Sequence, residues 1–221
     1  MLILAVDTST ERESVAVVES GSVRAELRLR AVDTHSRRLL PAAAFLLESL
    51  GLAPGAVQGY AVTAGPGAFT GLRVGIATVQ GLALASGRPC LAMSALDVMA
   101  ARIVEEAPVL AVMGEAYRGE VFGALYDAGA HPVSPPAVEP PEAFLARVPD
   151  GPVAFIGEGA RRHRSLVLER RPQARFPRRS LFLAGTLGLL AEPRLEAGEG
   201  VPPEALRPHY LREAHIRPPG P

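Results

Sequence analysis

The sequence contains no lysine, no asparagine and no tryptophan. Without lysine, the chain can form neither a P-loop, which places a lysine on the phosphates of a nucleotide, nor an enzyme site that forms a Schiff base with its substrate. Without asparagine, it has no acceptor for N-linked glycans. The 23 arginines balance 23 acidic residues, and the formal net charge of zero argues against a surface that binds polyanions everywhere. The 221 residues allow one large domain or two small ones.

Cysteine is almost absent as well. Cys90 is the only one, so no internal disulfide can form, and its apolar neighbours favour a buried thiol. The apolar residues 2–6 are followed at once by Asp7 and are too short for a signal peptide or a membrane span. The five histidines lack the spacing of a zinc site. We therefore expect a cytoplasmic protein that has no metal site and no cofactor and does not contact a membrane.

Apolar runs and turn residues predict two related halves. The predicted strands of the first half are residues 2–6, 14–19, 23–30 and 60–63. Its predicted helices are residues 36–50, residues 71–86 and a helix that Ser94 caps. The second half repeats the order of strand, polar loop and strand at residues 109–113, 120–126 and 153–156. Residues 128–141 and 192–208 are rich in proline and are predicted to be surface loops.

This layout predicts an α/β fold of the actin-like ATPase (ribonuclease H-like) type. Each of its two subdomains would contain a mixed sheet flanked by helices. We expect residues 1–104 to form an N-terminal subdomain and residues 105–221 to form a smaller C-terminal one. In this fold a nucleotide lies between the two halves, but a fold alone does not establish a function.

The most informative stretch is residues 65–75, which read GPGAFTGLRVG. This loop follows a short apolar strand and opens a helix that carries no charge between residues 74 and 87. A glycine loop in this position usually binds phosphate, because backbone N–H groups and the helix N-terminus attract anions. Asp7 and Thr8, at the end of the first strand, are the residue types that could orient Mg²⁺ and phosphate through water.

The charged partners of such a phosphate site are missing, however. No lysine exists, and Met113 stands where the second half would need a matching carboxylate, with Glu115 two residues later. Two interpretations stay open: a phosphate cradle, or a retained turn whose glycines permit close packing of a helix on a strand. The residues of this vestigial nucleotide loop are Asp7, Thr8, Gly65, Gly67, Thr70 and Gly71.

The two helices at residues 36–50 and 71–86 are more apolar than packing on one sheet requires. Leu40 and Phe45 widen the main stripe of the first helix, and its charged arc holds little more than Arg37 and Glu48. We interpret the excess as a subunit interface, with an unusually buried helix pair as the alternative. The predicted interface residues are Leu39, Ala43, Leu46, Leu50, Leu72, Ile76, Val79, Leu82 and Ala83.

A cluster of arginines lies between Arg161 and Arg179. Such a cluster usually forms a solvated face. An RNA-binding patch is the alternative, because phosphate contacts need basic clusters, although we expect no aromatic residues for base stacking in it.

Several motifs in order along the chain resemble those of the bacterial TsaB (YeaZ) family. The family's first strand ends in Asp-Thr-Ser, as at residues 7–9, and a His-Ser/Thr-x-x-Leu-Leu-Pro segment matches residues 35–41. Its hallmark, Gly-Pro-Gly-Ser-Phe-Thr-Gly-Leu-Arg-hydrophobic-Gly, matches residues 65–75 with Ala68 in place of serine. A Ser-x-Leu at residues 94–96 and a Pro-x-Tyr-Leu-Arg at residues 208–212 complete the resemblance. One departure is Glu115-Ala116-Tyr117, where the family commonly has Asp-Ala-Arg.

The resemblance implies a role in making N6-threonylcarbamoyladenosine at position 37 of tRNAs that read ANN codons. Proteins of this family are non-catalytic scaffolds that bind a catalytic paralogue, TsaD, through the same helices that let them homodimerise. An ATPase, TsaE, joins at that junction, and tRNA is reached only through the complex. The alternative functions are an active actin-like ATPase or small-molecule kinase that holds Mg-ATP on Asp7 and the glycine loop, and a peptidase, which the absence of a nucleophile or metal cluster disfavours.

Overall fold

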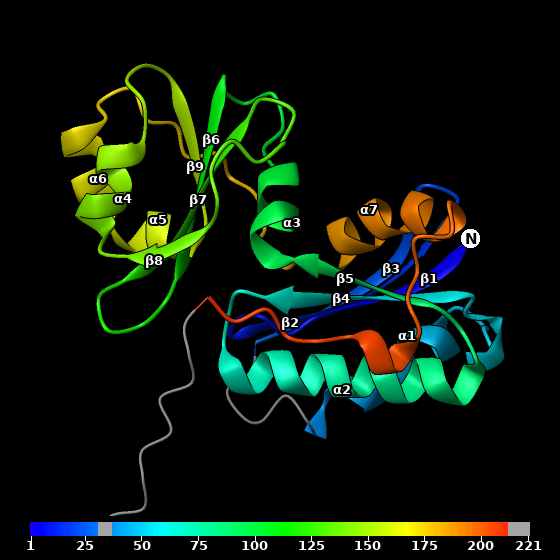
Figure 1. Cartoon of the computed structure of the whole chain (residues 1–221). Coiled ribbons are helices and arrows are strands. Elements are labelled where there is room, and N and C mark those ends of the chain that lie inside the picture. The colour runs from blue at the N-terminus through cyan, green and yellow to red at the C-terminus, as the bar shows by residue number, and fades with distance from the viewer. Residues whose placement is uncertain (31–36, 212–221) are drawn as a thin grey trace, which may run out of the picture.

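The two predicted halves form two lobes, each built on its own sheet (Figure 1). The computed structural model describes residues 1–30 and 37–211. The first sheet has the strand order β3-β2-β1-β4-β5, and the second has the order β8-β7-β6-β9. Both sheets are mixed, because β1 is antiparallel to β2 and parallel to β4, and β6 is antiparallel to β7 and parallel to β9. The predicted α/β class with two mixed sheets and flanking helices is confirmed.

The elements follow the chain in this order. In the first lobe the strands and helices are β1 (Leu2–Asp7), β2 (Arg12–Glu19), β3 (Ser22–Arg30), α1 (Leu39–Ser49), η2 (Pro54–Ala56), β4 (Gly59–Gly65), α2 (Phe69–Ser86), β5 (Cys90–Ser94) and α3 (Ala95–Ala101). In the second they are β6 (Val109–Glu115), β7 (Val121–Asp127), β8 (Ala137–Glu139), α4 (Pro141–Arg147), β9 (Val153–Ile156), α5 (Glu158–Arg162) and α6 (Arg164–Arg170). Helix α7 (Ala184–Glu196) and the short η3 (Pro203–Ala205) follow.

The central strands are apolar throughout because both of their faces are buried. On β1, Leu4 faces the core under α1 and α2, whereas Ile3 faces the core under α3 and α7. On β6, Leu110 belongs to the same core as Ile3, and Ala111 belongs to the core under α4 and α6. The core that contains Ile3 and Leu110 therefore runs through both lobes and joins them, with α3 between the two sheets (Figure 1).

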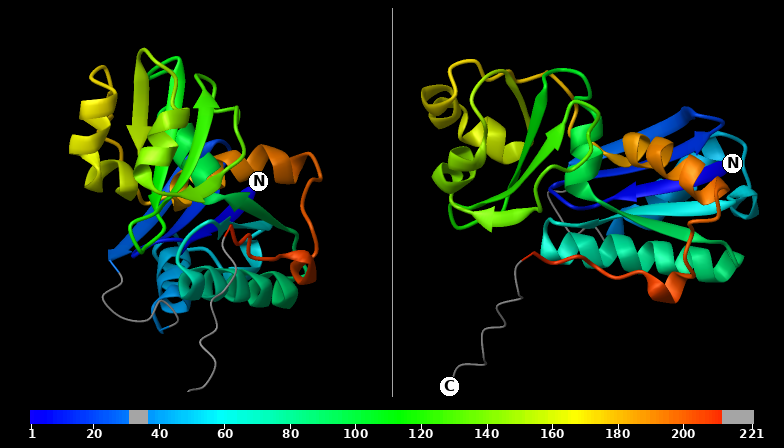
Figure 2. Two further views of the ribbon diagram at one scale, coloured as in Figure 1. Left: turned by 60° about the vertical axis from the view of Figure 1, so that its left-hand side comes forward. Right: turned by 45° about the horizontal axis from the view of Figure 1, so that its top comes forward.

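Helix α7 returns to the first lobe although it lies late in the chain (Figure 2). Its first N–H groups are satisfied by the sheet, since Ala184 N donates to Ser14 Oγ (3.1 Å) and Gly185 N donates to Glu26 Oε1 (3.2 Å). The prediction of a surface loop over residues 192–208 was therefore wrong for its first part, because packing on β1 and β2 stabilises a helix that contains Pro193. The division at residue 104 stays a prediction, and α7 belongs by its contacts to the first sheet.

Local signals placed the other boundaries well. Ser94 accepts from the backbone N of Leu96 and Asp97 and so caps α3, which confirms the predicted N-cap. The Ser20 and Gly21 turn has positive φ at both residues, as a tight hairpin requires. Helix α1 begins at Leu39 rather than at residue 36, and Ser36 lies outside the described residues. None of the helices within residues 1–30 and 37–211 is long and apolar enough to cross a membrane.

Helix α2 lies unusually close to the turn that follows β1. Thr8 Oγ1 donates to the carbonyl oxygen of Gly71 (2.8 Å), and a Cβ on Gly75 would lie 2.3 Å from that same hydroxyl oxygen. Gly81, two turns further along α2, is exposed and has no atom within 4 Å of the place where a Cβ would stand. Only the first of these two glycines is needed for packing.

Gly75→Ala is expected to lower the free energy of unfolding by about 1–3 kcal/mol, because the added methyl must displace Thr8. Gly81→Ala is the matched control and is expected to raise it by about 0.5–1 kcal/mol, since alanine loses less backbone entropy in a helix. Urea unfolding of both variants measures the difference. Equal effects at the two sites would contradict the close approach.

A buried carboxylate ties the start of the chain to α7. Glu192 accepts hydrogen bonds from Ser20 N (2.7 Å), Gly21 N (2.7 Å) and the ammonium group of Met1 (2.9 Å). Burial by itself raises the pKa of Glu192, but these three hydrogen bonds outweigh it and lower the pKa below the ordinary 4.5. Glu196 contacts the same ammonium group (2.8 Å) from an exposed position.

Because the folded-state pKa of Glu192 is lowered, its contribution is complete above pH 4.5 and is lost as the pH falls through the folded-state value. Glu192→Gln should therefore cost about 1–3 kcal/mol of unfolding free energy at pH 7, and the difference from wild type should shrink in acid. Glu196→Gln, the control, should cost less than about 1 kcal/mol. Thermal unfolding from pH 7 to pH 3 tests this, and a gap that stayed constant with pH would contradict it.

Candidate functional site

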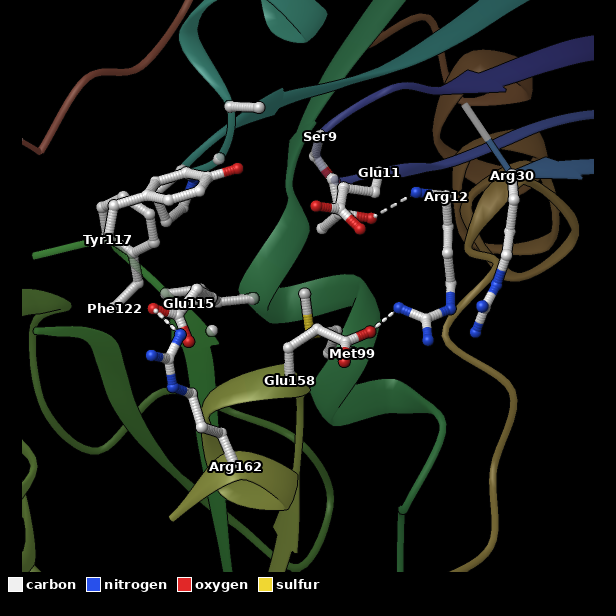
Figure 3. Close-up of a pocket in the computed structure, with 16 residues that line it drawn as sticks. Ser9, Glu11, Arg12, Arg30, Met99, Glu115, Tyr117, Phe122, Glu158 and Arg162 are labelled. Carbon is white, nitrogen blue, oxygen red and sulfur yellow. Dashed lines mark hydrogen bonds and ion pairs between the residues drawn. The ribbon is translucent and has the colours of Figure 1, made fainter. Parts of the chain in front are cut away.

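A pocket of about 490 Å³ opens between the two lobes (Figure 3). Its walls come from the turn between β1 and β2, the glycine loop before α2, helix α3, the end of β6 and helix α5. This is the place at which the predicted fold would hold a nucleotide. The lining is mixed, with three arginines, three glutamates and an apolar floor that includes Leu96, Met99 and Phe122.

Two ion pairs join four of the six charged side chains that line the pocket. Arg12 from β2 forms an ion pair with Glu158 of α5, which links the two lobes. Arg162 pairs with Glu115 at 3.3 Å (Figure 3). Burial lowers the pKa of Arg12, and the nearby charges of Arg161 and Arg30 lower it further. With these pairs in place, two of the three arginines in the lining, Arg12 and Arg162, are matched by carboxylates.

Asp7 is not available to this pocket. Its side chain is fully buried, and one carboxylate oxygen accepts from Ser9 N (3.1 Å), Ser9 Oγ (2.7 Å) and Thr63 Oγ1 (2.7 Å). Burial raises the pKa of Asp7, while the hydrogen bonds from Thr63 and Ser9 oppose that rise. The carboxylate therefore links the end of β1 to β4 through Thr63, and it is not among the residues that line the pocket.

The glycine loop folds directly onto the turn after β1. Ala68 N donates to the carbonyl oxygen of Ser9 (2.7 Å), and a Cβ on Gly67 would lie 2.2 Å from that oxygen. On the other side of the loop, His209 N donates to the carbonyl oxygen of Ala64 (2.7 Å) at the end of β4. The loop is thus held between two segments of its own chain, an arrangement that fits the packing interpretation of its glycines.

The other residues of the predicted nucleotide loop are placed as follows. Gly65 is buried at the end of β4, and Gly71 is buried in the first turn of α2, where its carbonyl accepts from Thr8. Thr70 is exposed at the start of α2. The loop residues therefore lie together, with Thr8 bonded to Gly71 and Thr70 exposed to solvent.

The second half offers no free carboxylate at the matching place. Met113 is fully buried in the core of the second lobe, and Glu115 is paired with Arg162. In the departure from the family pattern, Tyr117 has positive φ and is 53% exposed at the pocket rim. Within residues 1–30 and 37–211, no group of three or more His, Cys, Asp or Glu side chains could hold a metal ion.

The predicted interface residues lie on α1 and α2, which cover the same face of the first sheet (Figure 2). Most of them point inward, however. Buried against the lobe's own strands are Leu39, Ala43, Leu46, Leu72, Ile76, Val79 and Ala83. Leu50 and Leu82 are half-buried. The sheet already covers these side chains within the single chain, and both the interface and its residues stay a prediction.

The outer face of the same helices carries large apolar residues that are not covered. Leu40 is 53% exposed and Phe45 59% exposed on α1, and Leu84 is 73% exposed on α2. Leu84 was not among the interface residues predicted from the sequence. Its position on α2 away from the apolar stripe could have indicated that it is exposed. A further surface cluster joins Phe69, Arg73 and Tyr210: the Arg73 guanidinium lies 3.7 Å from the Phe69 ring centre and its Nε donates to Tyr210 (3.0 Å).

Comparison with known proteins gives a family. Residues 26–166 match the family model described as "TsaD: tRNA N6-adenosine threonylcarbamoyltransferase". The chain is 38% identical over 128 residues to a protein of Escherichia coli named tRNA threonylcarbamoyladenosine biosynthesis protein TsaB, an alignment that covers 57% of this chain and only 55% of that relative. It is 30% identical over 173 residues to the protein of the same name from Bacillus subtilis, which covers 76% of this chain and 75% of the relative.

Solved structures agree. YeaZ from Pseudomonas aeruginosa superposes with a TM-score of 0.79 and 36% identity over 95% of this chain and 99% of that chain. Component A of (R)-2-hydroxyglutaryl-CoA dehydratase from Acidaminococcus fermentans, at 11% identity and a TM-score of 0.60, shares the fold alone. The predicted actin-like fold is confirmed by these neighbours. The family model matches well over half of this chain, and the alignment with the Bacillus subtilis protein covers three quarters of that protein. The chain therefore belongs to the TsaB family, also called YeaZ.

Proposed function

We propose that this protein is a non-catalytic subunit of the assembly that forms N6-threonylcarbamoyladenosine at position 37 of ANN-decoding tRNAs. It would act in the cytoplasm, bind the catalytic paralogue TsaD and the ATPase TsaE, and form a homodimer through the same surface. Membership of the TsaB family supports the pathway, because the relatives in E. coli and B. subtilis are named for threonylcarbamoyladenosine biosynthesis.

The observation that carries the proposal is the uncovered apolar face of α1 and α2. Leu40, Phe45 and Leu84 expose more than half of their surface on two helices that lie side by side beneath the first sheet (Figure 2). Large apolar residues gathered on one face of a monomer mark protein interaction sites. Beside Leu84, the exposed residues Ala77, Gly81 and Ala85 are small. Small side chains allow a partner helix to approach closely.

The closed glycine loop supports the non-catalytic part of the proposal. An ATPase of this fold would need a carboxylate on the metal and open backbone donors for the phosphates. Asp7 is instead enclosed by Ser9 and Thr63, and the loop N–H of Ala68 is bonded to Ser9. No observation in the described structure favours the kinase or peptidase alternatives over a binding role.

The contact face can be tested with charges placed on exposed positions, which spare the fold. Phe45→Glu and Leu84→Glu are each expected to weaken both self-association and binding to TsaD by about 30-fold or more, because a central apolar contact is worth about 2 kcal/mol. Analytical ultracentrifugation measures the first and titration with purified TsaD measures the second.

Val133→Glu is the matched control, because Val133 is also apolar and 60% exposed but lies after β7 in the second lobe. It should leave both affinities unchanged, and all three variants should unfold at the wild-type temperature. If Phe45→Glu and Leu84→Glu bind TsaD as tightly as Val133→Glu does, the outer face of α1 and α2 is not the contact surface.

A further inference from the structure

Seven of the eight arginines between residues 161 and 179 fall into two groups in the structure, and the eighth, Arg170, is exposed at the end of α6. The first group is bonded to other parts of the chain. Arg179 pairs with Glu106 (2.7 Å) and Arg162 with Glu115 (3.3 Å). Arg171 donates to the carbonyl of Leu145 (3.0 Å), and Arg175 donates to that of Glu106 (3.3 Å). Two of these four arginines are thus ion-paired, and the other two donate to backbone carbonyl oxygens.

The second group surrounds a separate pocket. Arg161, Arg164 and Arg178 line a cavity of about 300 Å³ between the end of β9, α5, the start of α6 and the segment that follows α6. No carboxylate belongs to its lining, and none of the three takes part in an ion pair between residues that the structure describes. All three side chains are exposed. Three guanidinium groups around one opening create a local positive potential, although the net charge of the chain is zero.

Two of these arginines are held in place by neutral groups. The Arg164 guanidinium carbon lies 4.1 Å from the centre of the Phe176 ring, which itself stacks on Phe155 with ring centres 5.8 Å apart. Arg161 Nη2 donates to the carbonyl oxygen of Arg179 (3.0 Å). These contacts restrict the side chains without neutralising them. A pre-positioned guanidinium loses less entropy when it binds an oxyanion, and its fork of donors suits phosphate.

The aromatic residues decide what kind of ligand fits. Phe176 lies within the arginine cluster. Phe176 does not offer a free face for base stacking, since Arg164 covers the ring and Phe155 stacks on it. The pocket can therefore contact a phosphate group but has no platform for a base. Contacts of this kind position a nucleic acid and carry no sequence information.

We propose that the pocket formed by Arg161, Arg164 and Arg178 binds a backbone phosphate of RNA. This inference rests on the proposed function, which supplies a tRNA as the partner, and it goes beyond the expectation that tRNA is reached only through other subunits. Arg161 also lies close enough to Arg12, at the cleft between the lobes, to affect it electrostatically.

The test compares two single variants that remove the same charge. Arg178→Gln changes the pocket, whereas Arg170→Gln removes an exposed arginine on α6 that does not line it. Fluorescence anisotropy with a labelled, unmodified tRNA transcript is recorded at several salt concentrations, for the full chain alone and in complex with TsaD. Arg178→Gln should weaken binding several-fold and reduce the slope of log K against log salt by about one. Arg170→Gln should stay within twofold of wild type.

Three results would overturn the proposal. Equal losses in the two variants would show a general charge effect. If neither the wild-type chain nor its complex binds tRNA measurably, RNA is not the ligand of this pocket. Binding of inorganic phosphate that shifts the NMR signals of Arg178, without any difference in tRNA affinity, would make this a site for a free anion. Formation of threonylcarbamoyladenosine by the reconstituted wild-type complex is measured separately, so that a failure of the proposed function is not confused with a failure of the pocket.

Discussion

The contact between the glycine loop and the turn after β1 is the constraint on which the rest of the structure depends. Thr8 donates to Gly71, and Ala68 donates to Ser9, at distances that leave no room for a side chain at Gly67. These bonds hold α2 against the first sheet. They also occupy one backbone donor of the loop, the N–H of Ala68. The same local arrangement fixes which face of α2 is turned outward.

The proposed function places the work of the protein on its surfaces. Between the lobes, Arg12 and Glu158 pair across the cleft. On the first lobe, α1 and α2 expose Leu40, Phe45 and Leu84. On the second lobe, three arginines without carboxylate partners among the described residues surround a pocket. An apolar face and a basic pocket on different lobes are suited to a subunit that holds a protein partner and a nucleic acid at the same time.

The sequence predicted most of the first lobe, because the signals there are local. Apolar runs with both faces buried gave β1 and β6, and Ser94 gave the start of α3. Helix α7 was missed, since its stability comes from Ser14 and Glu26, more than 150 positions away. The interface residues were chosen from the stripe that faces the sheet, because a helical wheel shows an apolar arc but not which part of it is covered. The sequence could not predict which arginines form ion pairs either, because the partners lie far apart along the chain, as Glu106 and Arg179 do.

The central claim is that the outer face of α1 and α2 is the working surface and that the glycine loop is a packing element. Hydrogen–deuterium exchange of the full chain, alone, with TsaD and with Mg-ATP, tests this claim most directly, because it reports protection segment by segment. We predict that TsaD protects backbone amides in residues 39–49 and 69–86 and that Mg-ATP alone changes nothing. Protection of residues 65–71 by Mg-ATP alone, with α1 and α2 unaffected by TsaD, would contradict it.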